Sequence, residues 1–181
     1  MIAHAGAGAV HLVGYSDGGI VALLVALARP ELVRTMVLIG TNYHHDGLAA
    51  GVNDSFEPGS DIANFLGEEY GQRSPDGAEH FPIVLTKTVE MFATEPTMTT
   101  DDLKRLAMPA LVMVGDDDAV TPEHTLSLYE SLQNGQLAVI PGASHLVPIE
   151  QPALVFQLAD AFVQNGGAVS ELMPMRRAQA G

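Results

Sequence analysis

Four short apolar runs stand out along the chain. They are rich in Val, Leu and Ile and cover residues 9–14, 34–40, 110–115 and 136–140. Runs of this length without polar alternation are typical of strands buried on both faces of a parallel sheet. A helical pattern follows the first run at residues 17–28, and Arg29-Pro30 ends it. The pattern therefore predicts an α/β fold, with a mainly parallel sheet of about four strands flanked by helices.

The pattern changes between residues 41 and 107, where Gly, Asp, Asn and Pro are frequent. Helical pieces are predicted there at 61–70 and 82–92. Thr100 is the predicted N-cap of a further helix, because acidic residues follow it directly and basic residues come a turn later, as the helix dipole favours. We interpret residues 41–107 as a small helical cap.

This cap is inserted into a single domain that spans residues 1–181. The core of the domain is expected to comprise residues 1–40 and 108–165. Residues 166–181 contain Asn-Gly-Gly and a Met-Pro-Met-Arg-Arg segment, and we expect them to form a frayed tail.

The composition excludes several classes of protein. Acidic residues number 22 against 8 basic ones, and a formal charge of −14 repels nucleic acid and anionic membranes. The absence of Cys excludes disulfides, thiolate metal sites and cysteine nucleophiles. No stretch approaches the roughly 18 apolar residues of a membrane helix, and residues 1–8 lack the basic start of a signal peptide. We expect a cytoplasmic protein that binds neither nucleic acid nor membrane.

The most informative motif surrounds Ser16. Residues 14–19 read Gly-Tyr-Ser-Asp-Gly-Gly and lie between a predicted strand and a predicted helix. Gly-x-Ser-x-Gly in that position is the nucleophile elbow, a strained turn that exposes the serine hydroxyl. Gly14 and Gly18 are expected to be small because neighbouring backbone passes close to the turn. The pattern alone also fits a plain glycine-containing loop, so its context decides between the two.

An acid and a histidine follow in the order that the elbow requires. Asp118 ends the sequence Gly-Asp-Asp-Asp after the third strand, at the edge where open α/β sheets place their sites. His145 lies in a Gly-containing loop after the fourth strand. Three adjacent acids also suit a metal site or a solvated turn. No second ligand cluster is spaced to complete a metal cage, so we predict no metal.

These residues resemble the α/β-hydrolase superfamily over about residues 2–163. The likeness rests on the elbow at 14–19, the Gly-x-x-Asp turn at 115–118 and the Pro-Gly-x-x-His segment at 141–145. It implies a cofactor-free serine hydrolase that cleaves small carboxylic esters or lactones.

In the mechanism that the resemblance implies, Ser16 attacks the ester carbonyl and His145 takes the serine proton. Asp118 orients the imidazole, and water then frees the acyl group. The backbone N–H of Asp17 is the expected oxyanion donor. A serine nucleophile argues against haloalkane dehalogenation, because superfamily members with that chemistry use an aspartate.

Tyr15 and Asp17 are the expected substrate-binding residues. In some amino-acid-ester hydrolases of the superfamily, an acid directly after the serine binds the substrate ammonium group. Asp17 could equally stabilise the N-terminus of the helix it opens. We expect His11 to be structural. The His-His-Asp sequence at 44–46 looks metal-like, but adjacent side chains on an extended segment point opposite ways. A loop at the cap entrance is the favoured interpretation.

The superfamily fold, as the resemblance implies it, has about four strands before the elbow strand. They include its central neighbour and the loop that supplies a second oxyanion donor. Only residues 1–8 precede the elbow strand here, so we expect a fragment, a mis-started reading frame or a reduced family member. Strand 10–14 would then be an open apolar edge, and we predict a homodimer or larger assembly along it, or through the helix face that the missing strands would have covered.

Two other functions remain open beside the ester hydrolase. The first is a weakly active or inert α/β scaffold that self-associates. The second is a cofactor-free haloperoxidase or perhydrolase activity that uses the same triad. A nucleotide-binding fold is disfavoured, because residues 14–19 lack the Gly-x-Gly-x-x-Gly pattern and no phosphate-binding Lys follows.

Overall fold

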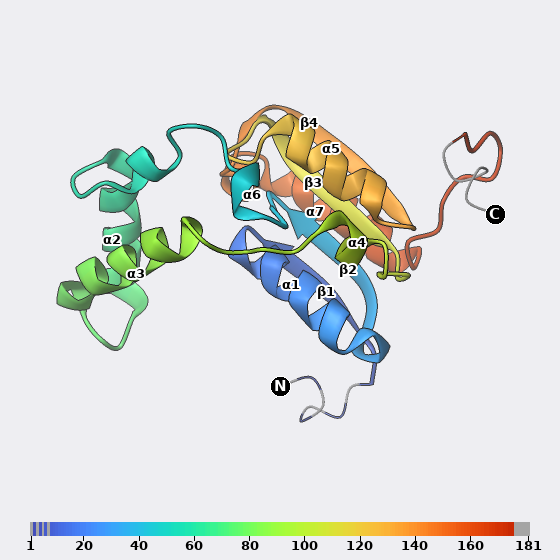
Figure 1. The fold of residues 1–181 in the computed structure, drawn as a ribbon, viewed down its shortest axis with the longest axis horizontal. Coiled ribbons are helices and arrows are strands. Elements are labelled where there is room, and N and C mark those ends of the chain that lie inside the picture. Colours follow the sequence, from blue (N-terminus) through green and yellow to red (C-terminus); the bar gives the residue numbers. More distant parts are fainter. Residues whose placement is uncertain (1, 3, 5, 7, 176–181) are drawn as a thin grey trace.

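A four-stranded parallel sheet forms the centre of the computed structural model, which describes residues 2, 4, 6 and 8–175 (Figure 1). Its strands lie in the order β1-β2-β3-β4. Their bounds are Val10–Tyr15, Val33–Ile39, Ala110–Asp117 and Gly135–Ser144. The predicted α/β fold class is confirmed. Strands β3 and β4 run beyond their predicted ends, because their pairing continues as far as Asp117 and Ser144.

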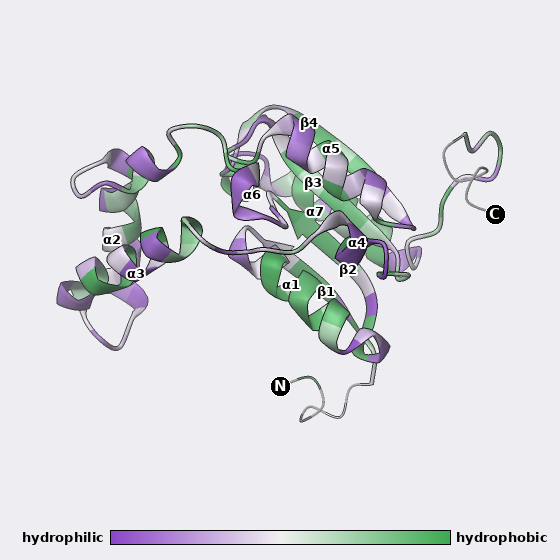
Figure 2. Ribbon diagram, viewed as in Figure 1, coloured by the Kyte–Doolittle hydropathy of each residue, from purple (hydrophilic) through white to green (hydrophobic). Residues whose placement is uncertain are grey.

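The alternation of side chains along the strands creates two hydrophobic layers. Met36 and Leu38 pack in one cluster with helices α1 (Asp17–Ala28), α4 (Thr100–Leu103) and α5 (Pro122–Ser131). Val37 and Ile39 pack in the other with α6 (Val147–Glu150) and α7 (Pro152–Gln164). The sheet is therefore covered on both faces, as its continuous apolar strands require (Figure 2).

The cap helices lie beside the sheet rather than on it (Figure 1). They are α2 (Asp61–Arg73) and α3 (Phe81–Phe92), and both predicted helical pieces are found. His44 and Thr97 form an isolated antiparallel bridge between the segments that lead into and out of the cap. Four 3-10 helices complete the described elements, at Pro30–Leu32, His45–Gly47, Asn53–Phe56 and Ala78–His80.

The N-cap of α4 is one residue earlier than predicted. Thr99 accepts a hydrogen bond from the backbone N–H of Asp102, and the Asp102 carboxylate accepts one from the Thr99 N–H. This reciprocal capping box satisfies two amides, which a cap at Thr100 would leave unpaired. Thr121 is the N-cap of α5, with its hydroxyl accepting a hydrogen bond from the His124 N–H.

Strand β1 is the edge strand of the described sheet and pairs there only with β2. Val13 on β1 is 60% exposed, and Val21 and Leu24 on α1 are also exposed. Figure 2 shows α1 as hydrophobic along most of its length. His11, on the same strand, makes a 2.7 Å hydrogen bond through Nδ1 to the Thr35 hydroxyl, which accords with a structural role.

Two findings concern the remaining expectations. No helix in the described part of the chain is both long and apolar enough to cross a membrane. Of the predicted frayed tail, residues 176–181 lie outside the described residues. Within its earlier part, the Gly167 carbonyl accepts a 2.9 Å hydrogen bond from the Gln136 amide.

Candidate active site

Ser16, Asp118 and His145 meet at the carboxyl edge of the sheet. Ser16 follows β1, Asp118 follows β3 and His145 follows β4. His145 Nε2 lies 3.0 Å from Ser16 Oγ, and His145 Nδ1 lies 2.8 Å from Asp118 Oδ1. Parallel strands bring their carboxyl ends to one edge, and for this reason residues 129 positions apart come into hydrogen-bond contact.

The backbone at Ser16 is strained. Its φ of 52° and ψ of −121° make it the only residue other than glycine with positive φ in the described part of the chain. Its N–H donates a 2.8 Å hydrogen bond to the Ile39 carbonyl, which ties the turn to β2. This is the conformation expected of an elbow that holds a hydroxyl clear of the sheet.

The elbow glycines differ in why they are small. A Cβ on Gly14 would collide with the Gly18 carbonyl, and one on Gly19 would collide with the Thr41 side chain. A Cβ on Gly18 would meet no described atom within 4 Å. The expectation that Gly18 must be small because neighbouring backbone passes close to it is therefore wrong. It is Gly14 that must be small, because the backbone of Gly18 passes close to it.

The side chain of Asp118 is fully buried, and one of its carboxylate oxygens accepts two hydrogen bonds. Its Oδ1 accepts from His145 Nδ1–H and from the Val120 N–H at 3.0 Å. Among the described residues, its Oδ2 has no hydrogen-bond partner. The charge-assisted hydrogen bond from this buried carboxylate fixes the orientation of the imidazole.

Gly40 is a site residue that the sequence reading missed. It follows β2 with a φ of 54°, and a Cβ there would lie 3.0 Å from both Cε1 and Nδ1 of His145. The same Cβ would lie 3.3 Å from Asp118 Oδ2. The available signal was a glycine directly after a buried strand, at the edge where the other site residues stand.

The loop that carries His145 is anchored by two further carboxylates. Asp116 Oδ1 accepts from the backbone N–H groups of Gly142 and Ala143, at 2.7 and 3.2 Å. Glu150 accepts from the backbone N–H and the hydroxyl of Ser144, at 2.7 and 2.8 Å. These four bonds fix the residues immediately before the histidine, so they set where the imidazole lies.

Tyr15 and Asp17 flank the serine and line the same cavity. The Tyr15 hydroxyl donates to the His145 carbonyl, and burial raises the pKa of Tyr15 to about 12, with the Asp118 and Glu150 carboxylates adding to the effect. Burial also raises the pKa of Asp17, while the nearby His145 acts in the opposite direction. Both predicted substrate-binding residues therefore lie beside the serine.

The cavity over Ser16 measures about 910 Å³, within the range of small-molecule sites. Its wall on the cap side is mostly apolar, with Ile62, Phe65, Leu66, Met91 and Phe92. Its charged lining consists of acids and His145, and none of the described lining residues is Lys or Arg. The cavity therefore favours neutral or cationic apolar molecules over anions.

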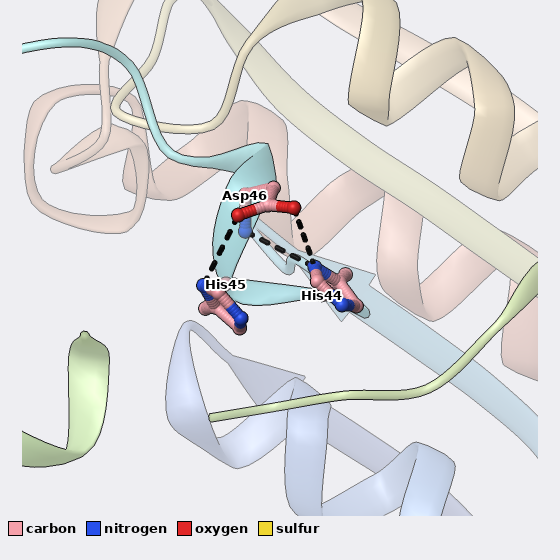
Figure 3. Close-up of side chains that lie close together, drawn as sticks. All are labelled: His44, His45 and Asp46. Carbon is pink, nitrogen blue, oxygen red and sulfur yellow. Dashed lines mark hydrogen bonds and ion pairs between the residues drawn. The ribbon is translucent and has the colours of Figure 1, made fainter. Parts of the chain in front are cut away.

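The side chains of His44, His45 and Asp46 converge rather than diverge (Figure 3). The expectation that they point opposite ways is wrong, because only His44 is extended, and His45 and Asp46 belong to the 3-10 turn that follows it. Asp46 lies 3.4 Å from His44 Nδ1 and 3.2 Å from His45 Nδ1, and the three possible ligand atoms lie within 4.8 Å of one another. His44 Nδ1 also accepts from the Asp46 N–H.

Two imidazoles and one carboxylate are ligand types that zinc accepts. The contacts within the turn already give each of the three groups a partner, so they account for the arrangement without an ion. These residues do not line the cavity over Ser16. The expectation of no metal stays a prediction.

Comparison with known proteins identifies the family. Residues 1–158 match the Alpha/beta hydrolase family, and the chain belongs to it. It is 27% identical to the (E)-2-((N-methylformamido)methylene)succinate hydrolase of Acinetobacter baylyi, over 87% of this chain and 66% of that protein. It is 29% identical to a non-heme haloperoxidase of Rhodococcus erythropolis, over 80% of this chain and 64% of that protein.

A solved structure agrees with this assignment. The thermophilic esterase of Thermogutta terrifontis superposes with a TM-score of 0.61 and 26% identity, over 92% of this chain and 69% of that one. The chain spans about two thirds of the length of the curated relatives it matches.

Proposed function

We propose that this chain is a serine hydrolase that cleaves small carboxylic esters or lactones, with Ser16 as nucleophile, His145 as general base and Asp118 as the group that orients the imidazole. One observation carries the proposal: an unbroken chain of hydrogen bonds runs from Ser16 Oγ through both ring nitrogens of His145 to Asp118. Nucleophile, base and orienting acid within hydrogen-bond reach are what covalent acyl transfer requires.

The proposed reaction has two steps. As Ser16 Oγ attacks the substrate carbonyl, its proton passes to His145 Nε2, and the imidazolium then protonates the leaving alkoxide. In the second step His145 takes a proton from water, which attacks the acyl-enzyme, and the imidazolium then returns that proton to Ser16 Oγ as the acid leaves. The buried Asp118 carboxylate stabilises the imidazolium in both steps.

The oxyanion would be bound by the backbone N–H of Asp17. Asp17 is the first residue of α1, so its N–H is among the first-turn amides that have no partner within the helix. The positive end of the helix dipole adds to the stabilisation of negative charge there. One such donor is typically worth about a hundred- to a thousandfold in rate.

Tyr15 and Asp17 are the proposed substrate-binding residues. Tyr15 forms part of the wall, and the Asp17 carboxylate would favour an ester that carries an ammonium group, since no Lys or Arg among the described lining residues competes for it. The names of two relatives, a succinate-derivative hydrolase and an esterase, support small carbonyl substrates in general.

Active-site labelling tests the proposal. The folded chain should react once with a fluorophosphonate, read as a single mass increase of the intact protein. Ser16→Ala should abolish the label, and His145→Ala should slow it strongly because the serine loses its base. Ser55→Ala is the matched control, since Ser55 lines the same cavity from the cap. A folded wild-type chain that does not react would contradict the proposal.

A second candidate is an inert scaffold that self-associates, and the exposed apolar edge of β1 favours it. We infer that the β1 edge of one copy would meet that of another. Light scattering at rising concentration tests this, and Val13→Lys should weaken the assembly because it places a charge on the exposed edge. A chain that stays monomeric would exclude self-association, whatever the labelling shows.

A further inference from the structure

The two cap helices present facing stripes that extend away from Ser16. On α2 the lining positions recur every three or four residues, so they share one face. They are Ile62, Phe65, Leu66, Glu69, Tyr70 and Arg73. The lining positions of α3 share a face in the same way. They are Phe81, Val84, Leu85, Thr88, Met91 and Phe92.

A second hollow of about 500 Å³ lies along these stripes. It shares Phe56, Leu66 and Thr88 with the cavity over Ser16, so the two hollows adjoin at these three residues. The helices lie next to each other in a hairpin (Figure 1), and their far ends pack through Tyr70 and Phe81 at 5.6 Å. The outer hollow therefore begins where the inner one ends, on the side away from the sheet.

The length of this path exceeds what a small acyl group needs. From Ile62 on the inner cavity to Arg73 on the outer hollow, eleven helical residues rise by about 16 Å. The partition between the two hollows is formed by the three residues that line both of them, Phe56, Leu66 and Thr88. None of these residues carries a charge.

The chemistry of the path favours hydrocarbon. The one cation of the outer hollow, Arg73, forms an ion pair with Glu69, so the charges of the two compensate each other. Phe65 and Met91 on the inner wall are each 41% exposed, which leaves apolar surface available to a ligand. An uncharged chain gains from burial along such a wall without having to leave a charge unpaired.

We propose that the groove between α2 and α3 binds the acyl chain of the substrate, so that, among the small esters proposed above, those with longer, unbranched and uncharged acyl chains bind best. The carbonyl would lie at Ser16, and the chain would pass Thr88 and Leu66 to end beside Val84 and Leu85. The part about esters rests on the proposed hydrolase function. Binding of the chain does not, because the cap residues would hold it whether or not Ser16 reacts.

The test therefore uses Ser16→Ala, which cannot form the acyl-enzyme, with methyl butanoate, hexanoate, octanoate and decanoate as probes. Affinity by calorimetry or NMR titration should rise with each added pair of methylenes, by up to about fourfold per methylene buried. The NMR signals of the Val84 methyls should move with methyl decanoate and stay in place with methyl butanoate.

A blocking variant and its matched control sharpen the result. Thr88→Trp fills the partition and should weaken methyl decanoate binding by about tenfold or more, with methyl butanoate binding unchanged. Thr86→Trp makes the same replacement on the exposed side of α3 and should leave both unchanged. If Thr88→Trp unfolds, Val84→Asp places a charge in the outer hollow alone and should weaken only the longest probes.

Equal affinity for all four esters would contradict the proposal that the groove binds the acyl chain. Equal effects of the two Trp variants would contradict it as well. The outcome is separable from that of the labelling experiment. Chain-length-dependent binding without fluorophosphonate labelling would support the acyl-chain groove and contradict the proposed hydrolase function. Fluorophosphonate labelling with binding that does not depend on chain length would support the hydrolase function and contradict the acyl-chain groove.

Discussion

The Tyr15 hydroxyl donates a 2.9 Å hydrogen bond to the backbone carbonyl of His145, 130 residues further along the chain. The tyrosine ring also lies 5.3 Å from the imidazole, tilted by 36°. One side chain, next to the proposed nucleophile, thus holds the loop that carries the proposed base. Neither the elbow strand nor the histidine loop fixes the Ser16–His145 distance alone.

Tyr15→Phe should therefore loosen the histidine loop while keeping the aromatic wall of the cavity. Loss of one hydrogen bond should cost about 1 kcal/mol of stability. We expect kcat/KM for a small ester to fall by roughly tenfold, because the imidazole spends less time within reach of Ser16. Steady-state kinetics and urea unfolding measure the two effects. Unchanged kinetics would mean that Asp116 and Glu150 suffice to hold the loop.

Gly40→Ala should damage activity more than stability. The new methyl group would sit 3.0 Å from two atoms of the His145 ring, on a residue whose φ of 54° also disfavours any side chain. We expect about a hundredfold loss of kcat/KM from displacing the imidazole, and a stability loss of about 1 kcal/mol or more from the backbone strain.

Gly59→Ala is the matched control for that change. Gly59 has a φ of 93°, yet a Cβ there meets no described atom within 4 Å. The control should lose stability through the same kind of backbone strain and keep its activity. Similar kinetic losses in both variants would show that backbone strain, and not crowding of His145, causes the defect.

Much of the core could be predicted because its pattern has one physical meaning. Short apolar runs without alternation are typical of strands in a parallel sheet, and the observed β1 to β4 lie within a few residues of the four runs. The helix at Asp17–Ala28 has the predicted bounds, since Gly14–Ser16 must turn before it and Pro30 ends it. Each of these signals is local, so a single sequence carries it.

The parts that were missed depend on distant neighbours. Gly40 matters only because His145 comes to lie against it, and Asp116 only because the loop at Gly142 folds back over it. The direction of the His44 and His45 rings depended on a 3-10 turn that hydropathy does not distinguish from an extended loop. The N-cap was misplaced by one residue because Thr99 and Thr100 are both good caps, and only the bond to Asp102 separates them.

Asp116 and Asp117, the last two residues of β3, should respond differently to mutation. Asp116→Ala removes the acceptor for two backbone amides of the histidine loop, and we expect a stability loss of about 1–3 kcal/mol with a fall in activity. Asp117→Ala, one residue along and on the cavity wall, should change the free energy of unfolding by at most about 0.5 kcal/mol. Urea unfolding of the two variants measures the difference. Equal losses in the free energy of unfolding would contradict the anchoring role of Asp116.

His124 should make the folded chain sensitive to mild acid. Its ring stacks on Tyr43 at 4.0 Å, and its Nε2 accepts the Tyr43 backbone N–H at 3.1 Å. Burial, reinforced by the neighbouring His44 and opposed by Asp46, lowers the pKa of His124 to about 4. A proton on Nε2 would remove the acceptor, so the folded state disfavours the charged form.

The sign of the effect follows from comparing the two states. In the unfolded chain this histidine titrates at about 6.5, so between about pH 6.5 and pH 4 the unfolded state binds more protons. Stability should be fully present above that window and fall as the pH drops through it. Urea unfolding at about pH 7.5 and about pH 5 should show the loss. His124→Gln should flatten the dependence, whereas replacing the exposed His4 by Gln should not. Parallel pH profiles for wild type and His124→Gln would contradict this account, because the titrating group would then lie elsewhere.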